Sequence, residues 1–349
     1  MKTVVVCAVQ APFIVGGAEI LVSELKENLD RRGFRVDVVN VPFKWYPVSE
    51  LVRQSLAWRL LDITESNGTT VDLVIPTKFP SYLVRHPRKV TWLFHQHREA
   101  YDLFGTEYCS MTDSAEDRQV RDAIRTMDST ALSECRSIYT ISQNVADRLS
   151  RYNGLPSTAL YPPPHHLGRY RHESDGDYLF YAGRLDRLKR LNLLIDAMKR
   201  VQCGAKLKIA GTGPLAPELK KQIDGLGVAD RVELLGFVSA DDLVDLYARC
   251  RAALYAPLNE DYGYVTVEAF FSRKPVITTS DSGGPLEFVA DDVSGTVAAP
   301  TPEALAEAID RLWQLPPSRL REMGEAGYTR VADITWDNVI DRLTESIRT

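Results

Sequence analysis

The chain has 349 residues, 44% of them hydrophobic and 26% charged, with a formal net charge of −5. This length predicts two domains with the composition of an ordinary globular protein, and the mild acidity gives no electrostatic reason to expect nucleic acid. Five scattered cysteines without a CxxC argue against a disulfide framework or a zinc site and suit a reducing cytoplasm.

Strands and helices are expected to alternate along the first half. A short apolar run, 4–9, is too short for a signal peptide and reads as a first strand. The strands expected after it are 35–41, 71–76, 90–94 and 138–142, with helices at about 21–33, 49–63, 114–134 and 144–152. This alternation predicts a parallel sheet that is covered on both faces.

Three consecutive prolines, Pro162–Pro164, and the polar run that follows them interrupt the alternation, which predicts a linker at about 162–176. The pattern then resumes with strands expected at 178–182, 207–210, 232–235, 252–255 and 276–279, and helices at 301–315, 317–332 and 336–348. We therefore expect an α/β protein with two doubly wound domains, residues 1–163 and 164–332, facing each other across a cleft. Residues 333–349 are expected to form a separate C-terminal helix.

The stretch Asn259–Phe271 follows a buried strand and carries two carboxylates, Glu260 and Glu268, with Gly263 between them. A strand, an acidic loop with a glycine and a helix start form the place where open α/β sheets bind nucleotides. The backbone N–H groups at such a helix start are able to hold a phosphate. The spacing of the two glutamates is by itself only a hint, because surface helices often carry such pairs.

Two other loops follow strands on the same expected rim of the second sheet. Arg184 and Lys189 lie in the first, and Gly211 and Gly213 in the second, where the glycines allow a ligand to approach the backbone. Two cations beside glycine-rich turns suit a diphosphate, although either cation alone is more often a solvated helix start. Asp175-Gly176-Asp177 is the single D-x-D, and its place before a strand favours solvated linker charge over a metal site.

These pieces together resemble glycosyltransferase family 4, the retaining nucleotide-sugar transferases with the GT-B fold. The resemblance covers nearly all of the second half and is looser in the first. The pieces that carry it are GGAE (16–19), TISQNVADRL (140–149), YAGRLDRLKRLNLLIDA (181–197), IAGTGP (209–214), LGFVSADDLVDLYARC (235–250), EDYGYVTVEAF (260–270), PVITTSDSGGPLEFV (275–289) and TWDNVIDRL (335–343).

The resemblance implies a role for each site residue and a C-terminal helix that crosses back to the N-terminal domain. Glu260 would contact hydroxyls of the transferred sugar, Glu268 the ribose, and Arg184 and Lys189 the diphosphate. The remaining donor-binding residues that it implies are Gly16, Gly17, Gly211, Gly213, Phe237, Val238, Gly263, Tyr264 and Val265. It also implies a front-face displacement in which the leaving phosphate takes the acceptor's proton, with no metal and no cofactor beyond the sugar nucleotide.

His95 ends the strand VTWLF and matches the family's histidine near the sugar, but His97 follows two residues later, so either one is a candidate. The first domain would bind a saccharide or lipid-linked acceptor. KWYP (44–47) with Arg53, Trp58 and Arg59 is a candidate membrane-edge surface, so we expect a cytoplasmic protein, with peripheral membrane contact as an open alternative.

Three other functions stay open at this point. An isomerase of the nucleotide-sugar 2-epimerase kind would share two such domains, and a non-catalytic sugar-nucleotide-binding protein would share the fold. An oxidoreductase is disfavoured because GGAE is not G-x-G-x-x-G. The nucleotide, the sugar, the acceptor and the oligomeric state do not follow from the sequence.

Overall fold

A computed structural model describes residues 1–12 and 16–348, and the chain divides into two compact units. Met1–His165 and Ile334–Thr349 form the N-terminal unit, and His166–Asp333 form the C-terminal unit. Each unit is built on a parallel sheet with helices on both faces, which confirms the predicted α/β class.

The sheet of the N-terminal unit runs in the order β2-β1-β5, and β5 continues to β6-β7-β8 through a parallel bridge between Val74 and Lys89. An antiparallel hairpin, β3 with β4, precedes β5, and neither it nor β8 was predicted. The strands are β1 (Thr3–Gln10), β2 (Arg35–Pro42), β3 (Glu65–Ser66), β4 (Thr69–Thr70), β5 (Leu73–Pro76), β6 (Val90–Leu93), β7 (Ser137–Thr140) and β8 (Thr158–Ala159).

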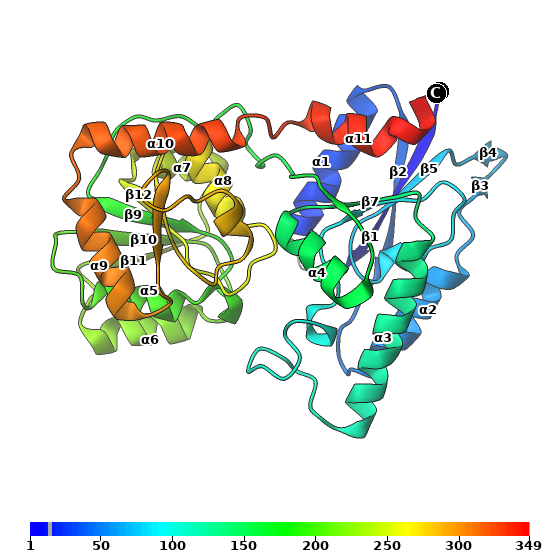
Figure 1. The fold of residues 1–349 in the computed structure, drawn as a ribbon, viewed down its shortest axis with the longest axis horizontal. Helices are drawn as coiled ribbons and strands as arrows, with labels where there is room; N and C mark the ends of the chain where they lie inside the picture. The colour runs from blue at the N-terminus through cyan, green and yellow to red at the C-terminus, as the bar shows by residue number, and fades with distance from the viewer. Residues whose placement is uncertain (13–15, 349) are drawn as a thin grey trace. The chain divides into compact units, whose positions relative to one another are not determined.

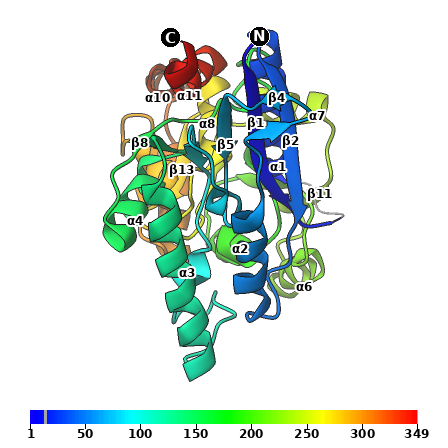
Figure 2. The same cartoon turned by 90° about the vertical axis from the view of Figure 1, so that its right-hand side faces the viewer.

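Helices cover both faces of this sheet. The first helix, α1 (Gly17–Arg31), packs against the C-terminal helix α11 (Trp336–Arg348), and Arg32 forms ion pairs with Asp337 and Asp341 there. The other face carries α2 (Glu50–Leu60), α3 (Ala115–Ser133) and α4 (Gln143–Asn153), of which α2 and α3 lie side by side in Figure 2.

The C-terminal unit has one six-stranded parallel sheet in the order β11-β10-β9-β12-β13-β14. Its central strand β9 is wholly buried because helices cover both faces, which explains its apolar sequence YLFYA. The strands are β9 (Tyr178–Ala182), β10 (Lys206–Ala210), β11 (Val232–Gly236), β12 (Ala252–Leu254), β13 (Val276–Thr279) and β14 (Gly295–Ala298).

The helices of this unit fall into two groups, which Figure 1 shows on opposite faces of the sheet. One group contains α5 (Leu191–Met198), α6 (Ala216–Leu226) and α9 (Pro302–Trp313), and the other α7 (Ala240–Arg249), α8 (Tyr264–Phe271) and α10 (Pro317–Val331). The Thr301 hydroxyl caps α9 by accepting a hydrogen bond from the Ala304 N–H.

The strand order places a topological switch point in each sheet. In the C-terminal unit the chain winds outward from β9 through β10 and β11, and then from β12 toward the other edge. In the N-terminal unit the corresponding change of direction falls between β1 and β5. Ligands of doubly wound sheets bind outside the carboxyl ends of the strands at such points.

The polar run before β9 is solvated only in part, so the prediction of a solvated linker is wrong at Asp175. Asp175 is 12% exposed and pairs with the fully buried Lys274 at 3.2 Å and with His172 at 3.0 Å. The run packs on the C-terminal unit because a buried ammonium group needs a countercharge and hydrogen-bond acceptors. Asp177 does lie at the surface, where it pairs with Lys206.

No helix among the described residues is both long and apolar enough to cross a membrane.

Candidate active site

Loops after β9, β12 and β13 meet at the switch point of the C-terminal unit. The Leu258 N–H donates to the Leu188 carbonyl, and the Glu260 N–H donates to the Ser282 carbonyl, both at 2.8 Å. These backbone bonds hold the three loops together through residues that are far apart in the sequence. They bring together Lys189 from the first loop and Glu260 from the second.

The Lys189 ammonium forms a direct ion pair with the Glu260 carboxylate. The two side chains are 20% and 18% exposed, so the pair is largely shielded from solvent. Burial opposes the charge on Lys189, but the carboxylates of Glu260 and Asp186 outweigh it, so the pKa of Lys189 is raised. The site therefore holds a permanent cation at neutral pH, and that cation is paired with the very carboxylate assigned to the sugar.

Arg184 precedes this pair in the same loop but is exposed. Its carbonyl accepts hydrogen bonds from the Tyr181 hydroxyl and the Asp186 N–H, both at 3.1 Å, which fixes the backbone at this point. The exposed guanidinium thus projects from the loop that also carries Lys189.

Gly211 and Gly213 have a structural requirement that the sequence did not reveal. A Cβ on Gly211 would lie 1.9 Å from the Gly183 carbonyl oxygen, and one on Gly213 would lie 2.4 Å from that of Leu185. The Leu185 N–H donates to the Thr212 carbonyl at 3.0 Å across the same contact. Here the close approach is between two segments of backbone, and it supports the loop that carries Arg184 and Lys189.

The helix α8 begins directly after the Glu260 loop. Gly263 precedes it with φ of 90°, and a Cβ there would lie 2.8 Å from Cγ of Pro285, so only glycine fits this turn. Tyr264 and Val265 are the first residues of the helix, whose N-terminal end carries partial positive charge. The backbone amides predicted to bind phosphate, those of Tyr264 and Val265, therefore lie four and five residues after Glu260 in the chain.

Glu268 lies one turn further along α8 and is 9% exposed. The Tyr247 hydroxyl of α7 donates to its Oε2 at 2.8 Å, a partner that the sequence did not indicate. Burial raises the pKa of Tyr247, and the Glu268 carboxylate adds to this, so the hydroxyl stays protonated and oriented.

The predicted base-binding residues follow β11 on the same rim of the sheet. Phe237 is 84% exposed, an unusual environment for a phenylalanine, and Val238 is half-buried. They stand on a strand-end loop, separate from the Lys189–Glu260 pair.

The N-terminal unit has its own charged pair at its switch point. The Glu19 carboxylate accepts from the Gly16 N–H at 2.9 Å and from the Lys78 ammonium at 2.7 Å. Burial opposes the charge on Glu19, but Lys78 and the Gly16 N–H lower its pKa overall. Gly16 and Gly17 are thus the cap and first residue of α1, and Lys78 ties them to the end of β5.

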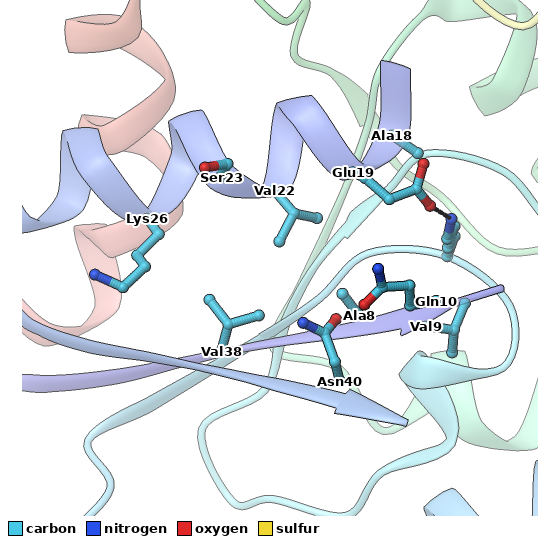
Figure 3. A pocket seen from close by; sticks show the side chains of 11 residues that line it. Ala8, Val9, Gln10, Ala18, Glu19, Val22, Ser23, Lys26, Val38 and Asn40 are labelled. Carbon is cyan, nitrogen blue, oxygen red and sulfur yellow. Dashed lines mark hydrogen bonds and ion pairs between the residues drawn. The ribbon is translucent and has the colours of Figure 1, made fainter. Parts of the chain in front are cut away.

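A pocket of about 240 Å³ lies beside this pair. Figure 3 shows α1 along one wall, with Ser23 and Lys26, and the ends of β1 and β2 along the other, with Gln10 and Asn40. Amide, hydroxyl and ammonium groups therefore surround a partly apolar floor.

The two candidate histidines have different surroundings. His97 packs its ring on Phe79 at 5.4 Å, and burial lowers the pKa of His97 to about 4, against the opposing effect of Glu99. His95 forms a parallel bridge with Lys78 at the end of β6, and its Nδ1 lies 2.9 Å from the Gln96 carbonyl oxygen. Both histidines therefore contact the segment that carries Lys78, His95 through its backbone and His97 through its ring.

The candidate membrane-edge surface is only partly exposed. Trp58 is fully buried and Arg59 pairs with Glu134, so neither belongs to it. Trp45 and Tyr46 are 41% and 58% exposed. The sequence pattern failed at Trp58 because the apolar residues of α2 form no clean stripe that separates its inner from its outer face.

Comparisons with known proteins show which families and proteins this chain is similar to. Residues 166–330 match the family model described as glycosyl transferases group 1. An uncharacterized glycosyltransferase of Methanocaldococcus jannaschii is 24% identical, over 97% of this chain and 96% of its own length. An alpha-1,3/1,6-mannosyltransferase of Homo sapiens is 36% identical, over 33% of this chain and 27% of its own. Apart from the archaeal protein, this chain spans 27 to 42% of the length of the similar curated proteins.

Solved structures match over the whole chain. Sucrose-phosphate synthase from Thermosynechococcus elongatus has a TM-score of 0.80 at 18% identity, with 100% of this chain and 98% of that chain covered. Anabaena HepE in complex with UDP and glucose has a TM-score of 0.72 at 17% identity, with 99% of each chain covered. The family-model match coincides with the unit that contains the Lys189–Glu260 pair.

Proposed function

We propose a specific reaction for this chain, which is a glycosyltransferase enzyme with the GT-B fold. It transfers a sugar, with retention of configuration, from a nucleoside-diphosphate sugar to a saccharide or lipid-linked saccharide, as a member of glycosyltransferase family 4. The observation that carries the proposal is the shielded Lys189–Glu260 pair at the switch point of the C-terminal unit, directly before the start of α8.

The charged groups of this unit suit a diphosphate donor. Lys189 remains protonated, Arg184 precedes it in the same loop, and the first turn of α8, which follows the Glu260 loop, adds positive potential. When the diphosphate binds Lys189, Glu260 is released from its ion pair and becomes available to sugar hydroxyls. Glu268, oriented by Tyr247, accepts hydrogen bonds from the ribose.

In the proposed reaction the bond between the anomeric carbon and the diphosphate oxygen breaks as the acceptor oxygen bonds to the same face. The acceptor's hydroxyl proton passes to the leaving phosphate. Charge grows on the diphosphate, and fixed cations in a shielded site stabilise that charge more strongly than water does. We propose that Lys189 and Arg184 fill this role without a metal, which predicts full activity after treatment with a chelator.

The acceptor is assigned to the N-terminal unit. The support is the pocket beside Lys78 and Glu19, whose amide and hydroxyl groups suit the hydroxyls of a saccharide. His95, bridged to Lys78, is placed at the sugar in this proposal.

The proposal includes peripheral membrane contact for a lipid-linked acceptor at the cytoplasmic face. Trp45 and Tyr46 are exposed next to one another, with the Lys44 ammonium 4.7 Å from the centre of the Tyr46 ring. Aromatic rings beside a cation suit the interface of an anionic lipid surface. Sedimentation with anionic vesicles tests this part, with neutral vesicles as the control.

The main test is a thermal-shift screen of UDP-, GDP-, dTDP- and ADP-sugars, followed by assay of nucleoside diphosphate release with acceptor added. We expect one nucleotide class to raise Tm, because a ligand that binds the folded state stabilises it. Conversion of the donor without an acceptor would indicate an isomerase, and binding without turnover would indicate a non-catalytic protein. Stabilisation by a dinucleotide alone would indicate an oxidoreductase.

A further inference from the structure

Arg190, the residue after Lys189, lies on the loop after β9 and binds the loops after β12 and β13. Its guanidinium donates to the carbonyls of Ala256 at 2.9 Å and Pro257 at 2.8 Å, to the Thr279 hydroxyl at 2.9 Å, and twice to the Asp281 carboxylate at 2.7 Å. Its side chain is 12% exposed. One side chain therefore connects the ends of β12 and β13 to the loop that carries Lys189.

The contact with Asp281 leads directly to Glu260. The Asn259 N–H donates to the Asp281 carbonyl at 2.8 Å, and the next N–H, that of Glu260, donates to the Ser282 carbonyl. Burial opposes the charge on Asp281, but Arg190 overcomes this and lowers its pKa, so the Arg190–Asp281 pair stays charged at neutral pH. Both partners of the Lys189–Glu260 pair are thus attached to the Arg190–Asp281 pair through one or two residues of backbone.

The backbone at Arg190 has φ of 49° and ψ of 42°, the left-handed conformation that glycine adopts most readily. An arginine at this position has an unfavourable backbone conformation, which its five hydrogen bonds offset. The turn directs the chain from Lys189 into α5, and the same residue fills the space between the loops.

We propose that Arg190 is a positioning residue, which holds Lys189 within ion-pairing distance of Glu260 by locking the loops after β9, β12 and β13 through Asp281. The inference rests on the proposed function for its catalytic consequence, but the geometric claim stands without it. Without the Arg190 guanidinium, the loops after β9 and β12 separate and the Lys189–Glu260 ion pair loosens. Lys189 then loses the carboxylate that raises its pKa.

The test replaces Arg190 with glycine, which relieves the backbone and removes the whole side chain together with its guanidinium. Arg273, which follows the C-terminal end of α8, is a matched control. It also has a positive φ, 52°, and its guanidinium pairs with Glu325 at 2.7 Å. Brief acetylation at fixed pH, read by mass spectrometry, reports the free amine of Lys189, and Lys220 on α6 serves as the internal reference.

We expect the acetylation rate of Lys189 to rise about tenfold in Arg190→Gly, because loss of the Glu260 contact lowers the pKa of Lys189 and leaves more free amine. Asp281→Asn, which keeps the side-chain shape, should also raise the acetylation rate of Lys189. Arg273→Gly leaves the rate within about twofold. Equal labelling of wild type and Arg190→Gly, or an equal rise in Arg273→Gly, would overturn the proposal.

Kinetics give the second reading. Arg190→Gly should lower kcat, and kcat should begin to fall at a lower pH on the alkaline side, because Lys189 loses its proton more easily. A purely structural loss would lower kcat at every pH without shifting this alkaline fall. If the wild type transfers no sugar from any donor, the proposed function fails, while the labelling result still decides the role of Arg190.

Discussion

Both units place a lysine–glutamate pair at the switch point of a parallel sheet, but they hold the pair in different ways. Glu260 lies on a loop and is supported by other loops, whereas Glu19 lies in the first turn of α1 and also accepts from the Gly16 N–H that begins that helix. Breaking the Lys78–Glu19 pair therefore disturbs a helix start. Breaking the Lys189–Glu260 pair frees both groups for a ligand, which makes the C-terminal pair the better candidate for chemistry.

The largest effect should come from the C-terminal pair. Lys189→Ala and Glu260→Ala should each lower kcat by about 10²–10³-fold, because each removes a shielded charge that acts on the donor in the proposed reaction. Steady-state release of nucleoside diphosphate measures this. Lys208→Ala, at a lysine that is 32% exposed on β10, is the matched control and should stay within about twofold of wild type. Near-normal turnover in both site variants would refute the site.

The N-terminal unit should show a large pH effect on stability at Asp128. This carboxyl is fully buried on α3, where burial raises its pKa to about 7, while the hydrogen bond from the Tyr101 hydroxyl acts in the opposite direction. The folded pKa is above the unfolded value of about 3.9. The stabilisation is therefore complete below that value and is lost as pH rises through about 7.

Unfolding of the wild type between pH 4 and 8 should show this loss, with a fall on the order of 3 kcal/mol from this group. Asp128→Asn cannot ionise and should remove most of the slope. Asp337→Asn, at an exposed aspartate on α11, serves as the control and should retain the slope. An unchanged slope in Asp128→Asn would show that this carboxyl is not the source.

A smaller effect should separate the roles of the two units. Lys78→Ala should raise the acceptor KM about tenfold, because it removes one charge-assisted hydrogen bond and loosens the Gly16 turn beside the pocket. The donor KM should change little. Lys26→Ala, at a lysine that is 41% exposed on the same pocket wall, is the comparison and should have a weaker effect. A rise confined to the donor KM would contradict the assignment of the acceptor to this unit.

The strand–helix alternation predicted most of both sheets because buried parallel strands are continuous apolar runs. The hairpin β3–β4, β8 and β14 were missed, because strands of two residues, or of four residues that begin with a glycine, carry little periodic signal. The sequence predicted Glu260 and Glu268 from their place around Gly263 after a buried strand, and Lys189 from a loop that follows another strand. It did not indicate that Lys189 and Glu260 pair with each other, because that contact depends on the relative positions of two loops 71 residues apart.

Arg190 and Tyr247 were missed for a related reason. Arg190 follows a lysine in a basic loop and looks like one more surface cation, and Tyr247 lies on an ordinary amphipathic helix. Their roles come from partners on distant segments, Asp281 and Glu268. The opposite error occurred at Asp175, whose polar neighbours suggested solvent although its partner, Lys274, is buried. Local composition predicts exposure, but a countercharge to a buried group is fixed only by the tertiary fold.

The smallest effect should appear at Phe237, which tests how far the C-terminal unit binds the nucleotide base. Its 84% exposure leaves a large apolar ring in water, and stacking of a base on that ring would cover it. Phe237→Ala should therefore weaken nucleotide binding about fivefold, the loss expected for one stacked base, with kcat nearly unchanged. Calorimetric titration of the nucleoside diphosphate measures this. Val293→Ala, at another exposed apolar residue of the same unit, should leave the affinity unaltered. Equal affinities for wild type and Phe237→Ala would place the base elsewhere on the rim of the sheet.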